Sequence, residues 1–80
     1  MTIVHSNTGF QPGKLLIYET NSMTVELDSS GIRKLSRYDN EIINKPEIIT
    51  IIEEGKQVTI SVDGKEFCQL ENYKKTNHDS

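Results

Sequence analysis

The 80-residue chain lacks most of the devices that stabilise small secreted or membrane proteins. Cys68 is its single cysteine, so no internal disulfide can form, whereas secreted domains of this length usually carry several. The opening residues, MTIVHSNTGF, have no basic stretch and too few apolar residues for a signal peptide. No run of about 18 apolar residues could cross a bilayer as a helix. We therefore expect a cytoplasmic protein with a modest core, because a chain this short buries little surface.

A strong charge of one sign is also missing. Nine Lys and Arg stand against twelve Asp and Glu, which gives a net charge of −3. Proteins that hold nucleic acid electrostatically usually present a basic face, so this balance argues against such a role. The balance is also too even for a DNA mimic built from packed carboxylates.

Residues that would identify an enzyme or a metal site are scarce. His5 and His78 lie near opposite ends of the chain and, with Cys68, lack the spacing of zinc ligands. GFQPGKL (9–15) only partly matches a phosphate-binding loop, because Leu15 stands where Ser or Thr is required. Four carboxylates fall mostly at predicted turns, where solubility explains them: Glu53, Glu54, Asp63 and Glu66. We expect no catalytic residue, no cofactor and no metal.

The first half of the chain contains a predicted hairpin. The runs KLLIYE (14–19) and MTVELD (23–28) are rich in strand-forming residues and flank a short polar turn. A two-residue loop, Asn21–Ser22, would bring Leu16 and Tyr18 to the face of the second strand's apolar residues. We favour a three-residue loop, because one face is then wholly apolar: Leu15, Ile17, Met23, Val25 and Leu27.

Residues 28–44, DSSGIRKLSRYDNEIIN, change period and predict a short helix. Four residues recur at helical steps of three, three and four: Ile32, Leu35, Tyr38 and Ile42. Asp28, Ser29 or Ser30 could cap the first amides, and Pro46 would end the helix. A strand over IRKLSRY is the alternative, with poorer alternation.

The second half, EIITIIEEGKQVTISVDGKEFCQL, predicts a three-stranded antiparallel meander. Asp63–Gly64 is a strong two-residue hairpin signal, and Glu54–Gly55 is a weaker one. Taken together, the two turns predict three facing pairs that form one apolar face: Ile51 with Val58, Ile49 with Ile60, and Ile60 with Phe67.

The expected fold is therefore α+β: a small antiparallel sheet, made from a hairpin and a C-terminal meander, with one short helix packed on one face. A small partly open β-barrel is the alternative. We expect one domain over 1–80, with a core at 14–70. Residues 1–13 form an N-terminal arm in which Ile3 and Val4 could add an edge strand, and residues 71–80 form a polar tail that frays.

Two surfaces are candidates for binding. Ile48 and Ile52 point away from the predicted apolar face, with Leu70 further along the same side. Either the arm or the first hairpin covers them, or they form a partner or dimer surface. The second candidate is a basic contact patch on the predicted helix, made of Arg33, Lys34, Arg37 and Tyr38.

These features favour a small non-catalytic module that binds a protein, acting as a regulator or inhibitor of the kind encoded by phages or mobile elements. The module could also form a homodimer. A nucleic-acid-binding β domain is one alternative, because the basic patch has tyrosines available for stacking. A small-ligand binder formed at a homodimer interface is another.

Overall fold

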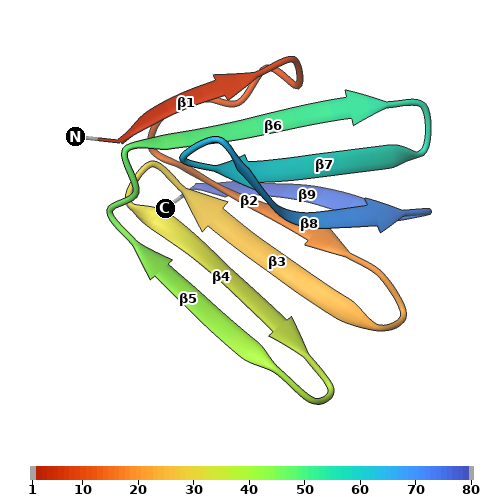
Figure 1. Cartoon of the computed structure of the whole chain (residues 1–80). Helices are drawn as coiled ribbons and strands as arrows, with labels where there is room; N and C mark the ends of the chain where they lie inside the picture. Colours follow the sequence, from red (N-terminus) through yellow and green to blue (C-terminus); the bar gives the residue numbers. More distant parts are fainter. Residues whose placement is uncertain (1, 80) are drawn as a thin grey trace.

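The computed structural model describes residues 2–79, and within them the chain forms nine strands and no helix (Figure 1). One sheet has the order β1-β6-β7-β8, comprising Ile3–Ser6, Ile48–Glu54, Gln57–Val62 and Lys65–Glu71. The other has the order β5-β4-β3-β2-β9, comprising Asn40–Asn44, Gly31–Ser36, Met23–Asp28, Lys14–Glu19 and Lys74–Asp79. The predicted α+β class is wrong. A single barrel is not formed either, since no strand pairing joins the two sheets within 2–79.

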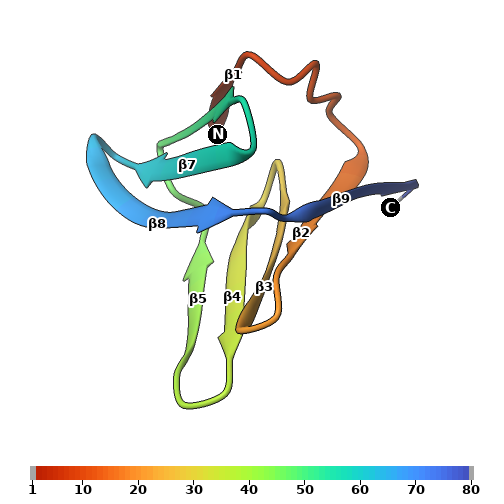
Figure 2. The ribbon, with the colours of Figure 1, turned by 90° about the vertical axis from the view of Figure 1, so that its right-hand side faces the viewer.

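The two sheets pack face to face and cross at a wide angle (Figure 2). Their inner faces supply one shared core: Leu16, Tyr18, Val25, Leu27 and Ile32 from the five-stranded sheet, and Ile49, Ile51, Val58, Ile60, Cys68 and Leu70 from the four-stranded sheet. At one corner β8 runs on into β9, so the chain passes from one sheet to the other (Figure 2). Asn72 turns this corner with a φ of 54°, and its N–H donates to the Lys56 carbonyl at 2.9 Å. Strands that change sheets in this way are typical of crossed sandwiches.

The predicted helix over 28–44 is replaced by β4, a turn and β5. Asp28 accepts hydrogen bonds from the Ser30 N–H at 2.8 Å and the Ser30 hydroxyl at 2.6 Å, which closes a tight turn where a helix cap was expected. Ile32 then lies between Leu27 and Ile43 in one cross-strand row. The apparent helical spacing was coincidental: Ile32 is buried, while Tyr38 of the same stripe is 90% exposed.

The first hairpin adopts the register with the two-residue loop. Leu16 pairs with Leu27 and Tyr18 with Val25, so the favoured three-residue loop is wrong. The Thr20 hydroxyl oxygen accepts from two N–H groups of the turn, that of Ser22 at 3.2 Å and that of Met23 at 3.1 Å. Burial of Tyr18 is tolerated because its hydroxyl finds an acceptor on the other sheet, a partner that local sequence could not reveal.

The C-terminal meander is confirmed as β6, β7 and β8, with changes in register. The Asp63–Gly64 turn forms as predicted, with φ values of 51° and 85°, and Val62 pairs with Lys65. The other turn uses Gly55 and Lys56 as its loop instead of Glu54 and Gly55. The pairing of β6 with β7 is therefore shifted by two residues from the predicted register, and Ile51 pairs with Ile60 rather than with Val58. A shift by two residues leaves each side chain on the predicted side of the sheet.

A β-bulge in β8 reverses the faces of that strand. Ser61 pairs with Glu66, but Ile60 pairs with Cys68, which leaves Phe67 as the extra residue. Ile60 was expected to face Phe67, and Leu70 was expected on the outer side. Because of the bulge, Cys68 and Leu70 turn into the core instead.

The two ends of the chain also form strands. β1 pairs in parallel with β6, which confirms the edge strand at Ile3 and Val4. The tail does not fray within 2–79: β9 pairs with β2 over six residues, from Lys74 opposite Glu19 to Asp79 opposite Lys14. A strand of polar residues is stable at this edge because backbone hydrogen bonds to β2, rather than burial of apolar side chains, hold it in the sheet.

Candidate functional site

The outer side of the four-stranded sheet carries a group of exposed isoleucines. Ile48 and Ile52 lie on β6 with exposed fractions of 37% and 42%, and Ile3 of β1 lies beside Ile48 with 52% exposed. Within residues 2–79 neither the N-terminal arm nor the first hairpin covers them, and the arm instead adds an isoleucine to the group. We call this surface the isoleucine face; it comprises Ile3, His5, Ile48, Thr50, Ile52, Thr59 and Ser61.

The middle of the isoleucine face holds no Lys, Arg, Asp or Glu because of the strand register, and its one titratable residue is His5, which pairs with Thr50. Thr50 pairs with Ser61, and Ile52 pairs with Thr59, so hydroxyl and methyl groups separate the isoleucines. Charged residues of the same sheet side lie toward its margins, at Glu54 beyond Ile52 and at Glu66 on β8. A surface whose exposed apolar side chains lie inside a charged margin resembles the anatomy of protein interfaces.

Polar side chains fix the strands that carry this face. Asp63 accepts from the N–H groups of Glu47 at 3.1 Å and Ile48 at 2.9 Å, which anchors the start of β6. At the other end, the Asn7 side chain donates to the Glu53 carbonyl at 2.9 Å and accepts from the Glu53 N–H at 2.8 Å. The side chain of Asn7 thus continues the backbone pairing of β1 with β6 and holds Ile3 in register beside Ile48.

Leu70 does not belong to this face. Its side chain is 2% exposed and lies in the core opposite Val58, because the bulge at Phe67 turned β8 over. The structure therefore keeps Ile48 and Ile52 from the predicted set together on one surface, replaces Leu70 with Ile3, and places Leu70 among the core residues.

The predicted basic patch is dispersed. Arg33 and Lys34 are neighbours on β4, so their side chains point to opposite sides of the five-stranded sheet. Lys34 is mostly buried on the inner side, where its ammonium lies 3.1 Å from Glu41 Oε1 and 5.2 Å from the centre of the Phe67 ring. Arg37 and Tyr38 lie in the turn between β4 and β5. No single face therefore presents all four residues, which the helical prediction required.

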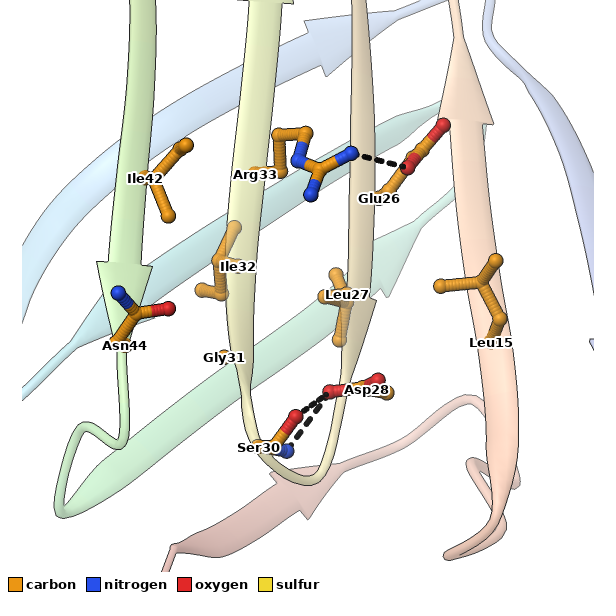
Figure 3. A pocket seen from close by; sticks show the side chains of 10 residues that line it. All are labelled: Leu15, Glu26, Leu27, Asp28, Ser30, Gly31, Ile32, Arg33, Ile42 and Asn44. Atoms are coloured by element: carbon orange, nitrogen blue, oxygen red, sulfur yellow. Dashed lines mark hydrogen bonds and ion pairs between the residues drawn. The ribbon is translucent and has the colours of Figure 1, made fainter. Parts of the chain in front are cut away.

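The outer side of the five-stranded sheet has a hollow of about 160 Å³ above Gly31 (Figure 3). Arg33 and Glu26 lie at one end of it, with Arg33 Nη1 3.9 Å from Glu26 Oε2, and the turn from Asp28 to Ser30 closes the other end. Leu15 and Ile42 flank it from β2 and β5 (Figure 3). Ligand pockets usually enclose about 300–1,000 Å³, so this hollow is too small for a typical small-molecule site.

A polar cluster joins the two sheets at one end of the core. The Tyr18 hydroxyl donates to Glu53 Oε2 at 2.7 Å, and Lys75 Nζ lies 2.9 Å from the same oxygen. The Tyr73 ring packs edge-on against Tyr18, with centroids 5.0 Å apart. These residues come from β2, β6, β9 and the corner before β9, so the cluster connects both sheets.

Burial and hydrogen bonding set the protonation of this cluster. Burial, reinforced by the Glu53 carboxylate, raises the pKa of Tyr18 far above its ordinary value. Burial also acts to raise the pKa of Glu53, but the bonds from Lys75 and Tyr18 outweigh it and leave that pKa below 4.5. The stabilisation from Glu53 is therefore complete above its ordinary pKa and is lost as the pH falls through the lowered value. Tyr18 stays a neutral donor and Glu53 a charged acceptor, an arrangement suited to holding the sheets together.

Groups that could support chemistry are few in the described part of the chain. Cys68 is buried, and its burial raises the pKa of the thiol to about 11, so the reactive thiolate is disfavoured. Among residues 2–79, no group of three or more His, Cys, Asp or Glu is arranged to hold a metal ion. The same residues contain no helix long and apolar enough to span a membrane.

Sequence reasoning missed Ile3 and the Tyr18–Glu53–Lys75 cluster. Ile3 joins the isoleucine face through a parallel pairing across more than forty residues of chain, for which no turn signal exists. The cluster draws on three strands that are distant in sequence. No protein-family model, curated protein or solved structure matches this chain, so the geometry of its surfaces is what bears on its function.

Proposed function

We propose that this protein is a small non-catalytic module that binds another protein chain through the isoleucine face. The observation that carries the proposal is the exposure of Ile3, Ile48 and Ile52 on one side of one sheet. Each square ångström of apolar surface removed from water contributes about 25 cal/mol, so covering the three exposed isoleucines is favourable. Adjacent exposed apolar side chains with a polar margin mark interaction sites more often than scattered ones do.

The shape of the surface fits a regulator or inhibitor of a cytoplasmic partner. A sheet face with exposed isoleucines can cover an apolar surface on a partner without enclosing a substrate. The buried thiol and the bonded state of the Tyr18–Glu53–Lys75 cluster favour this role over a catalytic one. The module is similar in size to accessory proteins of phages or mobile elements, which act by binding alone.

The test is site-specific photocrosslinking in the cells that produce the protein. A benzophenone amino acid replaces Thr59, which pairs with Ile52 on the isoleucine face, and in a matched variant it replaces Thr24 on the outer side of the other sheet. We expect discrete crosslinked products from position 59 that position 24 does not give, and their loss when Ile52→Lys is added. Absence of products from position 59, or the same products from both positions, overturns the proposal.

A further inference from the structure

Strand β5, at the edge of the five-stranded sheet, has a row of backbone groups that no strand within 2–79 pairs with. At one end of the β4–β5 pair, the Ser36 N–H donates to the Asp39 carbonyl at 3.0 Å. At the other end, the Lys45 N–H donates to the Ser30 carbonyl at 2.8 Å. Bonded and non-bonded pairs alternate along an antiparallel ladder, and the β4–β5 register is unbroken between these ends. The odd-numbered residues of β5 therefore direct their N–H and C=O groups to β4, and the even-numbered residues direct theirs away from it.

The outward groups belong to Asn40, Ile42 and Asn44. The β4–β5 hairpin extends past the four-stranded sheet, with β5 along its free side (Figure 2). A row of unpaired N–H and C=O groups is a template for a further strand, and proteins usually block such edges. The free edge of β5 is therefore accessible to another chain.

The other three edge strands have features that block pairing, and β5 has none of them. β1 is four residues long, and the chain bends back after it, where the Thr8 N–H donates to Ser6 Oγ at 2.9 Å. β8 is interrupted by the bulge at Phe67, and β9, with the sequence KKTNHD, carries two lysines and no apolar residue. β5, with the sequence NEIIN, has no lysine, no proline and no bulge. Its one charged residue, Glu41, is paired on the inner side with Lys34 at 3.1 Å.

We propose that β5 pairs with β5 of a second copy of this chain, antiparallel and around a two-fold axis beside Ile42. The two five-stranded sheets then form one continuous sheet across the dimer. In this register Ile42 faces Ile42, and Asn40 of each copy faces Asn44 of the other. All the outward groups meet outward groups, so about six intermolecular hydrogen bonds form. The Ile42 side chain, which is 60% exposed in the single copy, lies beside its counterpart.

Two neighbouring registers are less favourable. An axis beside Glu41 would place the Glu41 carboxylates of the two copies opposite each other, where like charges repel. An axis beside Ile43 would place Pro46, which has no N–H, opposite the outward groups of Asn40. The axis beside Ile42 avoids both and uses every outward group of the strand.

Opposite charges at both ends of this pairing point to a second copy as the occupant of the edge. The exposed Asp39 of each copy comes level with the exposed Lys45 of the other. The bond from Lys45 to Ser30 uses its backbone N–H, so the ammonium is not engaged by it. Glu47 lies past the end of the paired strands, at the end where the turn of the other copy carries Arg37. Exposed ion pairs contribute little energy, so these charges set the register more than the affinity.

The dimer is weak, because a pairing of five residues hides little surface. We expect a dissociation constant on the order of 100 µM, as for small transient interfaces.

Sedimentation of the purified chain from about 10 µM to about 1 mM measures the dimer, and amide hydrogen exchange locates it. Exchange at Asn40, Ile42 and Asn44 should slow about fivefold over this range, because their N–H groups gain acceptors. The N–H groups of Glu41 and Ile43 bond to β4 at every concentration, and their exchange should not change. A chain that is monomeric at 1 mM, or a dimer in which the three outward amides do not slow, overturns the proposal.

Ile42→Pro tests the centre of the interface. Proline removes an N–H that points away from β4, and an edge strand tolerates proline at such a position. Dimerisation should weaken at least tenfold, while Ile42→Val, the matched control, should leave it unchanged. Equal dimerisation by the two folded variants overturns the proposal.

A charge-swap series tests the register without altering the backbone. Asp39→Lys and Lys45→Asp each place like charges level with each other at both ends, and each should weaken dimerisation about fivefold at low salt. The double variant should regain the lost affinity, because Lys at 39 then meets Asp at 45 of the other copy. The two positions are six residues apart, about 20 Å, so they do not compensate within a copy. A double variant as weak as the single variants overturns the register.

The outcomes also separate this interface from the isoleucine face, which lies on the other sheet. Ile52→Lys should leave dimerisation unchanged. Dimerisation that is lost in Ile52→Lys but kept in Ile42→Pro overturns the pairing of β5 and assigns the second copy to the isoleucine face. A monomeric chain that still gives photocrosslinks from position 59 overturns the dimer and leaves the proposed function standing.

Discussion

The outer faces of the two sheets both carry exposed isoleucines, but the residues next to those isoleucines differ. On the four-stranded sheet, Ile3 and Ile48 are direct neighbours, and His5 and Thr50 follow them on the same side of the sheet. On the five-stranded sheet, the row through Ile17 and Ile42 has the Glu26–Arg33 ion pair between its two isoleucines. Ile42 is 60% exposed, more than any member of the isoleucine face. Contiguous exposed apolar side chains, rather than the exposure of single ones, distinguish a binding surface from an ordinary one.

The edge strands of the two sheets also differ, in the side-chain contacts that hold them. β5 ends the five-stranded sheet with an inner side that is partly polar, because Glu41 forms an ion pair there with the half-buried Lys34. β1 ends the four-stranded sheet and is tied to β6 by the Asn7 side chain as well as by the backbone. We infer that the isoleucine face is the better fixed of the two surfaces, which suits a surface that is to be recognised.

The largest expected effect is on the five-stranded side. A Cβ added at Gly31 would collide with the backbone carbonyl oxygen of Ile43 on the neighbouring strand, which cannot move without disturbing the β4–β5 pairing. We expect Gly31→Ala to lower the free energy of unfolding by about 2 kcal/mol, measured by urea denaturation. Thr59→Ala on the isoleucine face is the matched control and should change it by less than about 0.5 kcal/mol. An unchanged midpoint for Gly31→Ala would show that β5 is free to shift.

An intermediate effect is expected where the two sheets are joined. Tyr18→Phe keeps the ring against Tyr73 but removes the hydroxyl that donates to Glu53 across the core. Because the acceptor is charged and partly buried, we expect a loss of about 1–2 kcal/mol in unfolding free energy at pH 7. Tyr38→Phe, at an exposed turn, is the control and should have no effect.

The Tyr18→Phe variant also has a pH signature. Glu53 accepts the hydrogen bond in its charged form, so the difference between Tyr18→Phe and the natural chain should shrink as the pH falls through the lowered pKa of Glu53. A difference that stays constant from pH 7 to pH 3 would mean that packing of the hydroxyl, rather than its bond to Glu53, supplies the stabilisation.

The smallest effect on folding is expected on the isoleucine face itself. Ile52→Ser removes an exposed apolar side chain, and at a chain concentration of about 1 µM we expect the unfolding free energy to change by less than about 0.5 kcal/mol. Its neighbour Ile51 is fully buried, and Ile51→Val should cost about 1 kcal/mol. Equal losses for the two variants would mean that Ile52 serves the core, which would remove the reason for regarding it as a binding residue.

Strand positions and turns with local chemistry were predictable from the sequence. Lys14–Glu19, Met23–Asp28 and the three strands of the meander form where the β-prone runs lie, and Asp63–Gly64 makes the turn that its tolerance of positive φ predicts. The sequence also predicted that Ile48 and Ile52 lie on the other side of β6 from Ile49 and Ile51, but it left open whether another segment covers them, and the structure leaves them exposed.

The strand registers and the secondary structure of residues 28–44 were not predictable, because they depend on contacts with residues that are distant in the sequence. The favoured register of the first hairpin failed because Tyr18 is buried against Glu53, 35 residues away. The helix over 28–44 failed because β3 offers Ile32 a cross-strand place beside Leu27, a gain that the local spacing does not contain. The bulge at Phe67 moved Leu70 from the predicted surface into the core.

Local sequence is enough to specify that alternating apolar residues form strands, that Asp-Gly turns one pair of them, and that one side of β6 carries surplus isoleucines. These properties depend on neighbours along the chain, within reach of backbone geometry. In contrast, the position of Ile3 beside those isoleucines and the dispersal of the basic residues follow from the three-dimensional arrangement of the strands. Both depend on which strands meet across the fold, and that choice follows from packing two whole sheets around one core.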